Sequence, residues 1–229
     1  MLSILMPVYN ERATVERAIT EVLAAELPVE FELIVVDDGS TDGTSQILAD
    51  GDWGERVTLI SHERNQGKGA AVRTALGSAS GEFSAIFDAD LEYDPNDLTQ
   101  VLAPLLAGTA NAVFGVRAFD GYTSHSFLYV LGNRGVTLVA NILFNVYIKD
   151  LMTCHKAIRT DVFQALPLRA KGFDIEPEIA ARLLSRRERI YEVPVHYKAR
   201  PSDEGKKLTS ADGFRVVWTL LRCRLRPRG

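Results

Sequence analysis

The sequence predicts an α/β protein with a mostly parallel central sheet flanked by helices, and two observations support this prediction. In the first half of the chain, short apolar runs alternate with segments of helical periodicity. Polar segments rich in Asp, Asn and Gly follow directly after several of the apolar runs. This alternation is typical of βαβ units, in which the carboxyl ends of the parallel strands meet at one edge of the sheet and bind ligands.

Each element of the first half is assigned from its pattern. Ser3–Val8 is a compact apolar run and is expected to form the first strand. Glu11–Leu23 follows with apolar residues at helical spacing, and Asn10 is expected to be the N-cap of this helix. The further strands expected are Phe31–Val36, Val57–Ser61, Phe83–Phe87 and Asn111–Val116. The further helices expected are Thr44–Leu48, Gly69–Ser78 and Asn96–Leu106, the last opened by Pro95.

The second half begins with a long apolar segment, Phe127–Tyr147, which has about the length of a membrane span. Arg134 lies within it and makes insertion into a bilayer costly, so we expect a buried or groove-lining helix instead. The elements expected after it are a strand at Cys154–Arg159, a helix at Pro177–Ser185, a strand at Ile190–Tyr197 and a helix at Ala211–Arg224. We predict one domain over residues 1–209 and a basic amphipathic helix over residues 210–229.

Composition restricts the class of protein. With 46% hydrophobic and 24% charged residues, the 229-residue chain is typical of a globular domain and unlike disordered or fibrous proteins. Its two cysteines, Cys154 and Cys223, argue against a disulfide scaffold or a zinc site and are typical of a reducing compartment. The N-terminus lacks the basic region of a signal peptide, so we expect a cytoplasmic protein.

The charge is distributed unevenly along the chain. Residues 1–184 have a net charge of −11, whereas residues 185–229 have a net charge of +7. The basic end is either a solvated helix or a surface that faces phosphate or an anionic membrane. The last helix has apolar residues at helical spacing, namely Phe214, Val217, Trp218, Leu221 and Leu225. This pattern favours peripheral binding on the inner face of a membrane, with packing on the protein's own core as the alternative; no nucleic-acid partner is expected.

The segment Asp88-Ala89-Asp90 comes directly after an expected strand and is a candidate metal site. Two carboxylates at this spacing can share a hard divalent cation, and that cation can neutralise a diphosphate. Glu92 lies two residues further on and could complete the set of ligands. A lone D-x-D pattern is weak evidence, because such pairs also occur in ordinary loops and helix caps.

Two other polar segments are candidates for binding a nucleotide. Asp37-Asp38-Gly39 follows a buried strand, where a carboxylate could accept hydrogen bonds from a nucleobase or a ribose as well as cap the turn. Asn65-Gln66-Gly67-Lys68-Gly69 combines a glycine turn, a lysine and a helix N-terminus, which together suit an anion. It is not a P-loop, and the first β-α turn lacks the G-x-G-x-x-G of dinucleotide-binding proteins.

These segments are far more specific in combination. Their order is Pro7-Val8-Tyr9-Asn10-Glu11, then Val35-Val36-Asp37-Asp38-Gly39-Ser40-Thr41-Asp42, then Asn65-Gln66-Gly67-Lys68-Gly69-Ala70, then Asp88-Ala89-Asp90. In this order they resemble the family 2 glycosyltransferases, which have the GT-A (nucleotide-diphospho-sugar transferase) fold. The similarity continues through Phe114-Gly115-Val116-Arg117, Asn133-Arg134, Cys154-His155-Lys156-Ala157, Gly172-Phe173-Asp174-Ile175-Glu176-Pro177-Glu178 and Tyr197-Lys198-Ala199-Arg200. It covers about residues 2–215 and is greatest for the dolichyl- and polyprenyl-phosphate mannose synthase branch.

The resemblance implies a role for individual residues on the donor side. Those implied to bind the nucleotide sugar are Pro7, Tyr9, Glu11, Asp38, Lys68 and Asp88. Asp88 and Asp90 would bind Mg²⁺ or Mn²⁺ together with Glu92, where this branch often has Gln. Asp90 is therefore expected to be essential for catalysis.

On the acceptor side, the resemblance implies that arginines meet a phosphate. Arg117, Arg134 and Arg200 would face it, because guanidinium groups match the geometry of phosphate oxygens. Lys206 and Lys207 are weaker candidates for the same role. His155 stands where the family usually has Tyr, and we expect it to be a structural histidine whose hydrogen bonds are satisfied.

The leading hypothesis is an inverting, metal-dependent glycosyltransferase that moves a hexose from a GDP- or UDP-sugar to a polyprenyl phosphate. A second hypothesis keeps the donor and replaces the acceptor by a hydroxyl group of a sugar, a protein or a small molecule. That reaction needs a general base, for which Asp174 and Glu176 are the candidates. A third hypothesis is a nucleotide-sugar-binding protein without turnover, although a pure binder has no need to stabilise a leaving group.

Overall fold

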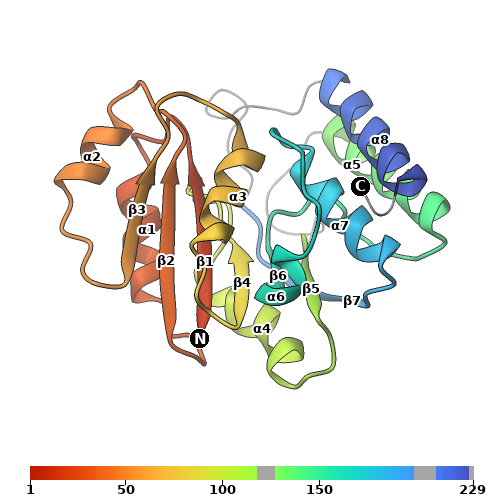
Figure 1. Ribbon diagram of the computed structural model, residues 1–229, viewed down its shortest axis with the longest axis horizontal. Helices are drawn as coiled ribbons and strands as arrows, with labels where there is room; N and C mark the ends of the chain where they lie inside the picture. Colours follow the sequence, from red (N-terminus) through yellow and green to blue (C-terminus); the bar gives the residue numbers. More distant parts are fainter. Residues whose placement is uncertain (118–126, 199–209, 227–229) are drawn as a thin grey trace.

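The computed structural model describes residues 1–117, 127–198 and 210–226, and within them the chain forms a seven-stranded sheet (Figure 1). The strands are β1 (Leu2–Val8), β2 (Phe31–Asp37), β3 (Val57–Ser61), β4 (Phe83–Ile86), β5 (Ala112–Arg117), β6 (Lys156–Arg159) and β7 (Ile190–Val195). Their order across the sheet is β3-β2-β1-β4-β6-β5-β7. β6 is antiparallel to β4 and β5, and the other pairs are parallel. The prediction of a mostly parallel α/β sheet is confirmed.

Helices cover both faces of this sheet. They are α1 (Val15–Ala24), α2 (Thr44–Asp50), α3 (Lys68–Gly77), α4 (Leu98–Leu106), α5 (Phe127–Phe144), α6 (Thr160–Gln164), α7 (Ile175–Ser185) and α8 (Ser210–Leu225). A short 3₁₀ turn, Pro95–Asp97, precedes α4. In Figure 1, α3 and α7 lie in front of the sheet and α1 lies behind it. α5 and α8 pack against each other and against α7, so they form an outer layer beyond the sheet.

Two apolar cores lie on the two faces of the sheet, as the alternation of side chains along a strand requires. Leu2, Ile4 and Met6 of β1 are fully buried in the core that α1 and α4 cover. Leu5 of the same strand belongs to the core formed with α3, α5, α7 and α8. β1 has β2 on one side and β4 on the other, so the connections diverge there. In α/β proteins, ligands commonly bind at the carboxyl ends of the strands beside such a switch point.

The expected strands and helices are all present, but some of their bounds differ. α1 begins at Val15 and not at Glu11, because residues 11–14 form a turn in which the Val15 amide donates to the Glu11 carbonyl (2.9 Å). Asn10 is therefore not the N-cap, and that prediction is wrong: Asn10 has a φ of +54° and its Oδ1 accepts from the Thr41 amide (2.8 Å). The helix α6 was not expected, because a five-residue helix carries too little periodicity to detect.

α5 is only partly the buried helix that the sequence predicts. Asn133, Thr137 and Ala140 lie on its buried face, whereas Leu138 and Ile142 are 58% and 71% exposed. Arg134 is also exposed. In the parts of the chain that are described, no helix is both long enough and apolar enough to cross a membrane.

α8 both packs on the protein and presents apolar residues outward. Val216, Leu220 and Cys223 are buried in the core shared with α5 and α7. Phe214, Trp218 and Leu225 lie on another face and are 67–80% exposed. The packed helix and the exposed apolar stripe, which the sequence treats as alternatives, are therefore two faces of one helix.

Candidate active site

The loops that follow β1 and β2 are tied together at the carboxyl edge of the sheet. The Asn10 amide donates to Ser40 Oγ (2.9 Å), and the Arg12 amide donates to Asp42 Oδ2 (3.1 Å). Asp37 supports the second loop by accepting from the Ser40 amide (3.1 Å) and from the Ser45 hydroxyl. Tyr9, at the end of β1, is 44% exposed beside these bonds. Together they hold the polar segments that the sequence predicts to meet at this edge.

Asp38 connects the loop after β2 to the loop after β3. Its carboxylate accepts from the amides of Gln66 (2.9 Å) and Gly67 (2.7 Å), and Oδ1 lies 2.7 Å from His62 Nδ1. Only 1% of Asp38 is exposed. The structure thus shows Asp38 as a support for the turn that precedes Lys68, while its expected contact with a nucleotide stays a prediction.

Two glycines allow that turn to approach the backbone of another segment. Gly67 has a φ of +96°, a conformation that side chains other than glycine rarely adopt. A Cβ at Gly67 would collide with the carbonyl of Lys171, and one at Gly69 would collide with that of Ala170. The Gly69 amide donates to the Lys171 carbonyl (2.8 Å). The N-terminus of α3 is thereby fixed against residues 170–172.

Lys68, the first residue of α3, belongs to a row of alternating charges that runs into the interior. Lys68 Nζ lies 2.7 Å from Asp88 Oδ2 and 3.2 Å from Glu176 Oε1. Glu176 Oε2 is in turn 2.8 Å from Lys156 Nζ, whose side chain is fully buried. Lys156 also donates to the carbonyls of Leu151 and Thr153. Burial alone would lower the pKa of Lys68, but the charges of Asp88 and Glu176 raise that pKa well above its usual value, so the ammonium group stays charged.

The other two expected metal ligands lie just beyond Asp88. Asp90 Oδ1 accepts from the Glu92 amide (3.1 Å), and Leu91 between them has a φ of +60°. Glu92 Oε2 accepts from the Tyr197 hydroxyl (2.9 Å), which ties it to the segment after β7. Within the described ranges, no three His, Cys, Asp or Glu side chains converge as a complete metal site. The pair Asp88 and Asp90 still suits Mg²⁺ or Mn²⁺, since such ions commonly take one or two carboxylates and complete their shell with substrate phosphates and water.

Arg117 forms a buried, bidentate pair with Asp150. Arg117 Nε and Nη2 donate to the two carboxylate oxygens at 2.7 and 2.8 Å, and Asn133 Nδ2 donates to Asp150 Oδ1 (3.1 Å). The guanidinium also lies 5.1 Å from the centre of the Tyr197 ring. Burial would raise the pKa of Asp150, but Arg117 lowers it overall. Sequence reasoning did not identify Asp150, because nothing in its local sequence signals a partner 33 residues away.

The other acceptor candidates are Arg134, Arg200, Lys206 and Lys207. Arg134 is exposed on α5. Arg200, Lys206 and Lys207 lie outside the described residues. The expectation that these cations meet an acceptor phosphate therefore stays a prediction.

His155 differs from the expectation of a histidine with satisfied hydrogen bonds. Its side chain is fully buried, and neither ring nitrogen has a hydrogen-bond partner among the described residues. The ring stacks on Tyr93, with centroids 5.1 Å apart, and meets Phe87 edge-on at 5.6 Å. Burial lowers the pKa of His155 to about 4, so the ring is neutral near pH 7. Packing between aromatic rings, and not hydrogen bonding, accounts for its position.

Asp174, a candidate for the general base, accepts hydrogen bonds through both of its carboxylate oxygens. Its Oδ1 accepts from the Gly172 amide (3.2 Å), and its Oδ2 accepts from the Thr219 hydroxyl of α8 (3.2 Å). Among the donor-side candidates, Glu11 Oε2 accepts from Thr14 Oγ1 (2.7 Å), and Pro7 is half-buried within β1. In the structure Lys68 contacts both Asp88 and Glu176. Asp38 holds the turn before Lys68, and Asp174 contacts α8.

The chain is similar to known proteins in both sequence and structure. A family model described as glycosyl transferase family 2 matches residues 3–166. Dolichol-phosphate mannosyltransferase of Pyrococcus furiosus is 27% identical over 96% of the chain, which spans only 64% of that relative's length. A UDP-N-acetylglucosamine–dolichyl-phosphate N-acetylglucosaminyltransferase of Methanococcus voltae is 23% identical, over 98% of the chain and 96% of the relative.

The solved structures with a similar fold include glucosyl-3-phosphoglycerate synthase from Mycobacterium tuberculosis. Its complex with UDP superposes with a TM-score of 0.74 at 26% identity, and covers 98% of this chain and 80% of that one. The same enzyme has been crystallised with Mn²⁺ and UDP, and that structure is 24% identical at a TM-score of 0.74. The expected GT-A architecture is therefore confirmed.

Proposed function

Because the chain belongs to glycosyl transferase family 2, we propose that it is an inverting transferase that moves a hexose, mannose or glucose, from a GDP- or UDP-sugar to a polyprenyl phosphate. The observation that carries this proposal is the pair Asp88 and Asp90 at the carboxyl end of β4, with Lys68 2.7 Å from Asp88. Two carboxylates and a cation thus lie at the carboxyl edge of the sheet, where α/β proteins commonly bind ligands. The names of the Pyrococcus and Methanococcus relatives support the acceptor class.

On the donor side, the chain's own groups suit a sugar nucleotide. Asp88 and Asp90, with Glu92 as a third candidate, would hold Mg²⁺ or Mn²⁺. That ion would stabilise the negative charge of the leaving diphosphate. Lys68 is positioned for the same anion, because the turn at Gly67 and Gly69 holds the start of α3 against residues 170–172. Tyr9 and Glu11, on the neighbouring loop, would line the nucleotide pocket with Pro7 and Asp38.

On the acceptor side, the engaged carboxylates favour a phosphate over a hydroxyl group. A phosphate monoester is largely ionised near neutral pH, so its oxygen can attack the sugar without losing a proton to a base. Glu176 is only 2% exposed and lies between Lys68 and Lys156. Asp174 accepts hydrogen bonds from Gly172 and Thr219. Neither candidate is therefore well prepared to act as a base, which makes transfer to a hydroxyl acceptor the weaker alternative.

The arrangement of α5 and α8 supports peripheral binding on the inner face of a membrane, where a polyprenyl phosphate resides. These two helices pack side by side and expose large apolar residues. The exposed residues are Leu131, Leu138 and Ile142 of α5 and Phe214, Trp218 and Leu225 of α8. Exposed Arg134 and Arg224 add positive charge, which suits anionic lipids. In this proposal residues 1–209 are the transferase domain and residues 210–229 the amphipathic helix.

A screen of GDP- and UDP-sugars with Mn²⁺ tests this function, with a short polyprenyl phosphate and a panel of hydroxyl acceptors. We expect transfer to the phosphate with one of the two nucleotides, and loss of that transfer in EDTA. Glu176→Gln and Asp174→Asn should each retain measurable transfer to the phosphate. Transfer to a hydroxyl acceptor alone, abolished by either substitution while donor binding is preserved, would instead identify a catalytic base. Sugar-nucleotide binding without any turnover would indicate a binding protein.

A further inference from the structure

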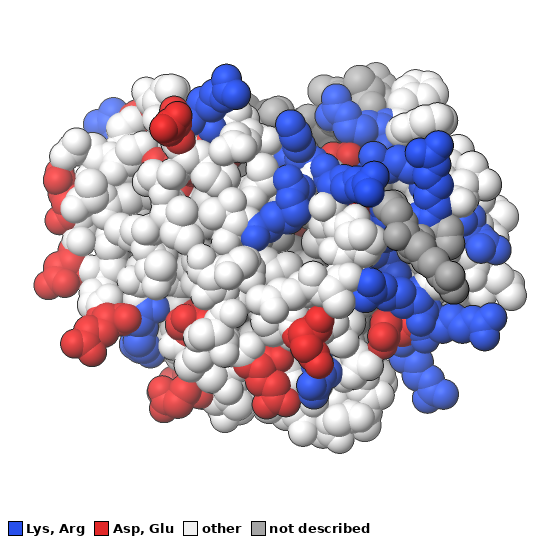
Figure 2. All heavy atoms as spheres, in the orientation of Figure 1, with Lys and Arg blue, Asp and Glu red and all other residues white. Residues whose placement is uncertain are grey.

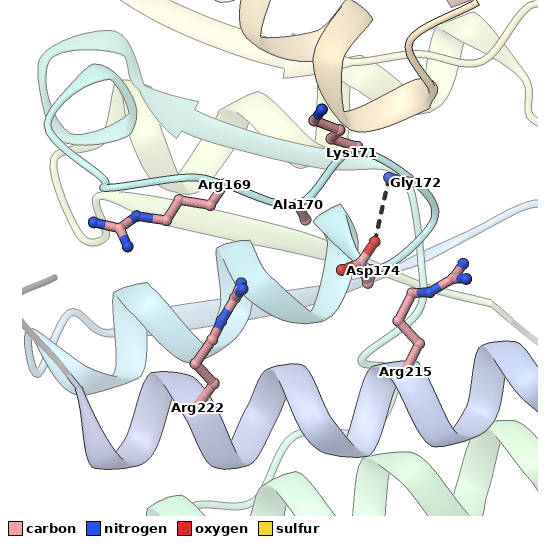
Figure 3. A pocket seen from close by; sticks show the side chains of 7 residues that line it. All are labelled: Arg169, Ala170, Lys171, Gly172, Asp174, Arg215 and Arg222. Atoms are coloured by element: carbon pink, nitrogen blue, oxygen red, sulfur yellow. Dashed lines mark hydrogen bonds between the residues drawn. The ribbon is translucent and has the colours of Figure 1, made fainter.

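A basic cavity lies between the segment that precedes α7 and the helix α8 (Figure 3). It has a volume of about 360 Å³ and is lined by residues 169–172 and Asp174 on one side and by Arg215 and Arg222 on the other. Arg215 and Arg222 project from α8 toward the segment, on either side of Asp174 (Figure 3). Four of the lining residues are cations, Arg169, Lys171, Arg215 and Arg222, against the one acid Asp174.

The acidic side chains in and beneath this cavity bond to the two segments that form its walls. Asp174 accepts from the Gly172 amide and the Thr219 hydroxyl, which joins the segment to α8. Glu178, fully buried below, accepts from the amides of Arg169 (2.7 Å) and Ala170 (2.6 Å). Its other oxygen lies 3.1 Å from Arg222 Nη2. These two carboxylates thus tie the segment to α8. The residues that line the cavity carry more positive than negative charges.

We propose that this cavity, which is lined by none of Asp88, Asp90 and Lys68, binds a phosphate monoester. Guanidinium and ammonium groups together match a dianionic phosphate, because arginine offers paired donors and lysine a compact charge. A volume of about 360 Å³ lies at the lower end of the range for small-molecule sites, so it suits a phosphate with a small organic group. Lys and Arg side chains crowd this side of the molecule in Figure 2, which favours the approach of an anion.

The phosphate could belong to a lipid headgroup or to a soluble ester, and α8 makes the first source worth testing. Phe214 and Trp218 are 80% and 67% exposed on the same helix that supplies Arg215 and Arg222. At 3.6 residues per turn, the two arginines project roughly 60 to 80° around the helix from this apolar stripe. A membrane that contacts Phe214 and Trp218 would bring headgroups to the rim of the cavity. The chemistry recognised is the same for either source.

The experiment measures binding directly and does not depend on transferase activity. Binding of inorganic phosphate and of glycerol 3-phosphate is measured by calorimetry. Binding to phosphatidylcholine vesicles that contain either phosphatidic acid or phosphatidylglycerol is measured by sedimentation. The test variant is Lys171→Gln/Arg215→Gln, because Arg222 pairs with buried Glu178 and its loss would leave that charge unpaired. The matched control is Lys149→Gln/Arg189→Gln, which removes two exposed positive charges elsewhere on the surface.

We expect the test variant to lose about tenfold or more in affinity for the phosphate monoester, with the control within about twofold of wild type. A loss seen with glycerol 3-phosphate assigns the site to a soluble ester. A loss confined to vesicles with phosphatidic acid, a lipid phosphomonoester, assigns it to a headgroup. Equal losses in both variants, or no binding of any probe by the wild type, would overturn the proposal. Circular dichroism checks folding, and the single variant Lys171→Gln should show part of the same loss.

Discussion

The two sides of the candidate active site are built in different ways. The donor-side loops, residues 9–12, 38–44, 62–69 and 88–92, are joined to one another by short-range polar contacts. Asp38 alone accepts two backbone amides and contacts His62. The helical side, formed by α5, α7 and α8, is joined mainly through apolar packing and presents cations and apolar residues outward.

This difference indicates what each side is prepared to bind. Loops held by amide-to-carboxylate hydrogen bonds form a preorganised site, which suits a rigid, polar ligand such as a nucleotide. Exposed apolar side chains beside arginines suit a ligand that arrives from a lipid surface. The five predictions below test this division between the two sides.

Among these predictions, the largest loss of transferase activity is expected for a substitution of Asp90 on the donor side. Asp90→Ala is expected to lower kcat by about a thousandfold and to weaken metal-dependent nucleotide binding, because one of the three candidate metal ligands is lost. Transfer rates and calorimetry of nucleoside diphosphate with and without Mn²⁺ measure both effects. Asp52→Asn, which alters an exposed acid on a distant loop, is the control. Full activity of wild type in EDTA would contradict the metal dependence.

His155, buried against Phe87 and Tyr93, should make the stability of the fold sensitive to acid. Its pKa is about 4 when folded and 6.5 when unfolded, so the unfolded chain binds the proton more readily. The contribution of the neutral ring is therefore intact above pH 6.5 and is lost as the pH falls toward 4. The loss amounts to about 3 kcal/mol in the free energy of unfolding. Urea denaturation should show this slope in wild type and a shallower one in His155→Phe; parallel curves would refute it.

On the helical side, Arg134 tests whether an exposed cation serves the acceptor. Arg134→Ala should lower kcat for a phosphate acceptor by about a hundredfold, and Arg134→Lys should recover part of it because lysine lacks the paired donors. Steady-state kinetics with a short polyprenyl phosphate separates kcat from KM. Arg17→Ala, on the exposed face of α1, is the control. Unchanged kinetics in Arg134→Ala would remove this residue from the acceptor site.

Asp38 tests how far the donor-side loops depend on a single carboxylate. Asp38→Ala frees the amides of Gln66 and Gly67, so donor affinity should fall by about tenfold while kcat changes less. Calorimetric titration with nucleoside diphosphate gives the dissociation constant, and thermal unfolding reports the accompanying loss of stability. An unchanged dissociation constant would show that the turn before Lys68 holds without Asp38.

The weakest single effect is expected at the apolar surface of α8. Trp218→Ser should reduce binding to anionic liposomes by several-fold, because an exposed side chain contributes only part of the buried apolar area. Leu59→Ser, at an exposed residue of β3 on the far edge of the sheet, is the matched control. Equal binding by wild type and Trp218→Ser would limit α8 to packing on the protein.

The amino-acid sequence by itself predicts the strands, most helices and the order of the polar segments. These features depend on local periodicity and on residues that are neighbours in the chain, which is why Asp88, Asp90 and the turn at Gly67 could be identified. The α/β class followed from the same alternation. The strand β6 was expected, but its antiparallel direction could not be predicted, because direction is set by the partners that a strand finds and not by its own residues.

Only the tertiary structure decided which charges meet. Arg117 pairs with Asp150, Lys68 with Asp88 and Glu176, and residues 169–171 share a basic cavity with α8. The same holds for His155, whose ring nitrogens lie between aromatic rings without a hydrogen-bond partner among the described residues. These contacts join segments 20 or more residues apart, so they arise from the packing of the sheet and its helices. A charged residue's type is visible in the sequence, whereas its partner and its burial, which set its chemistry, depend on the folded chain.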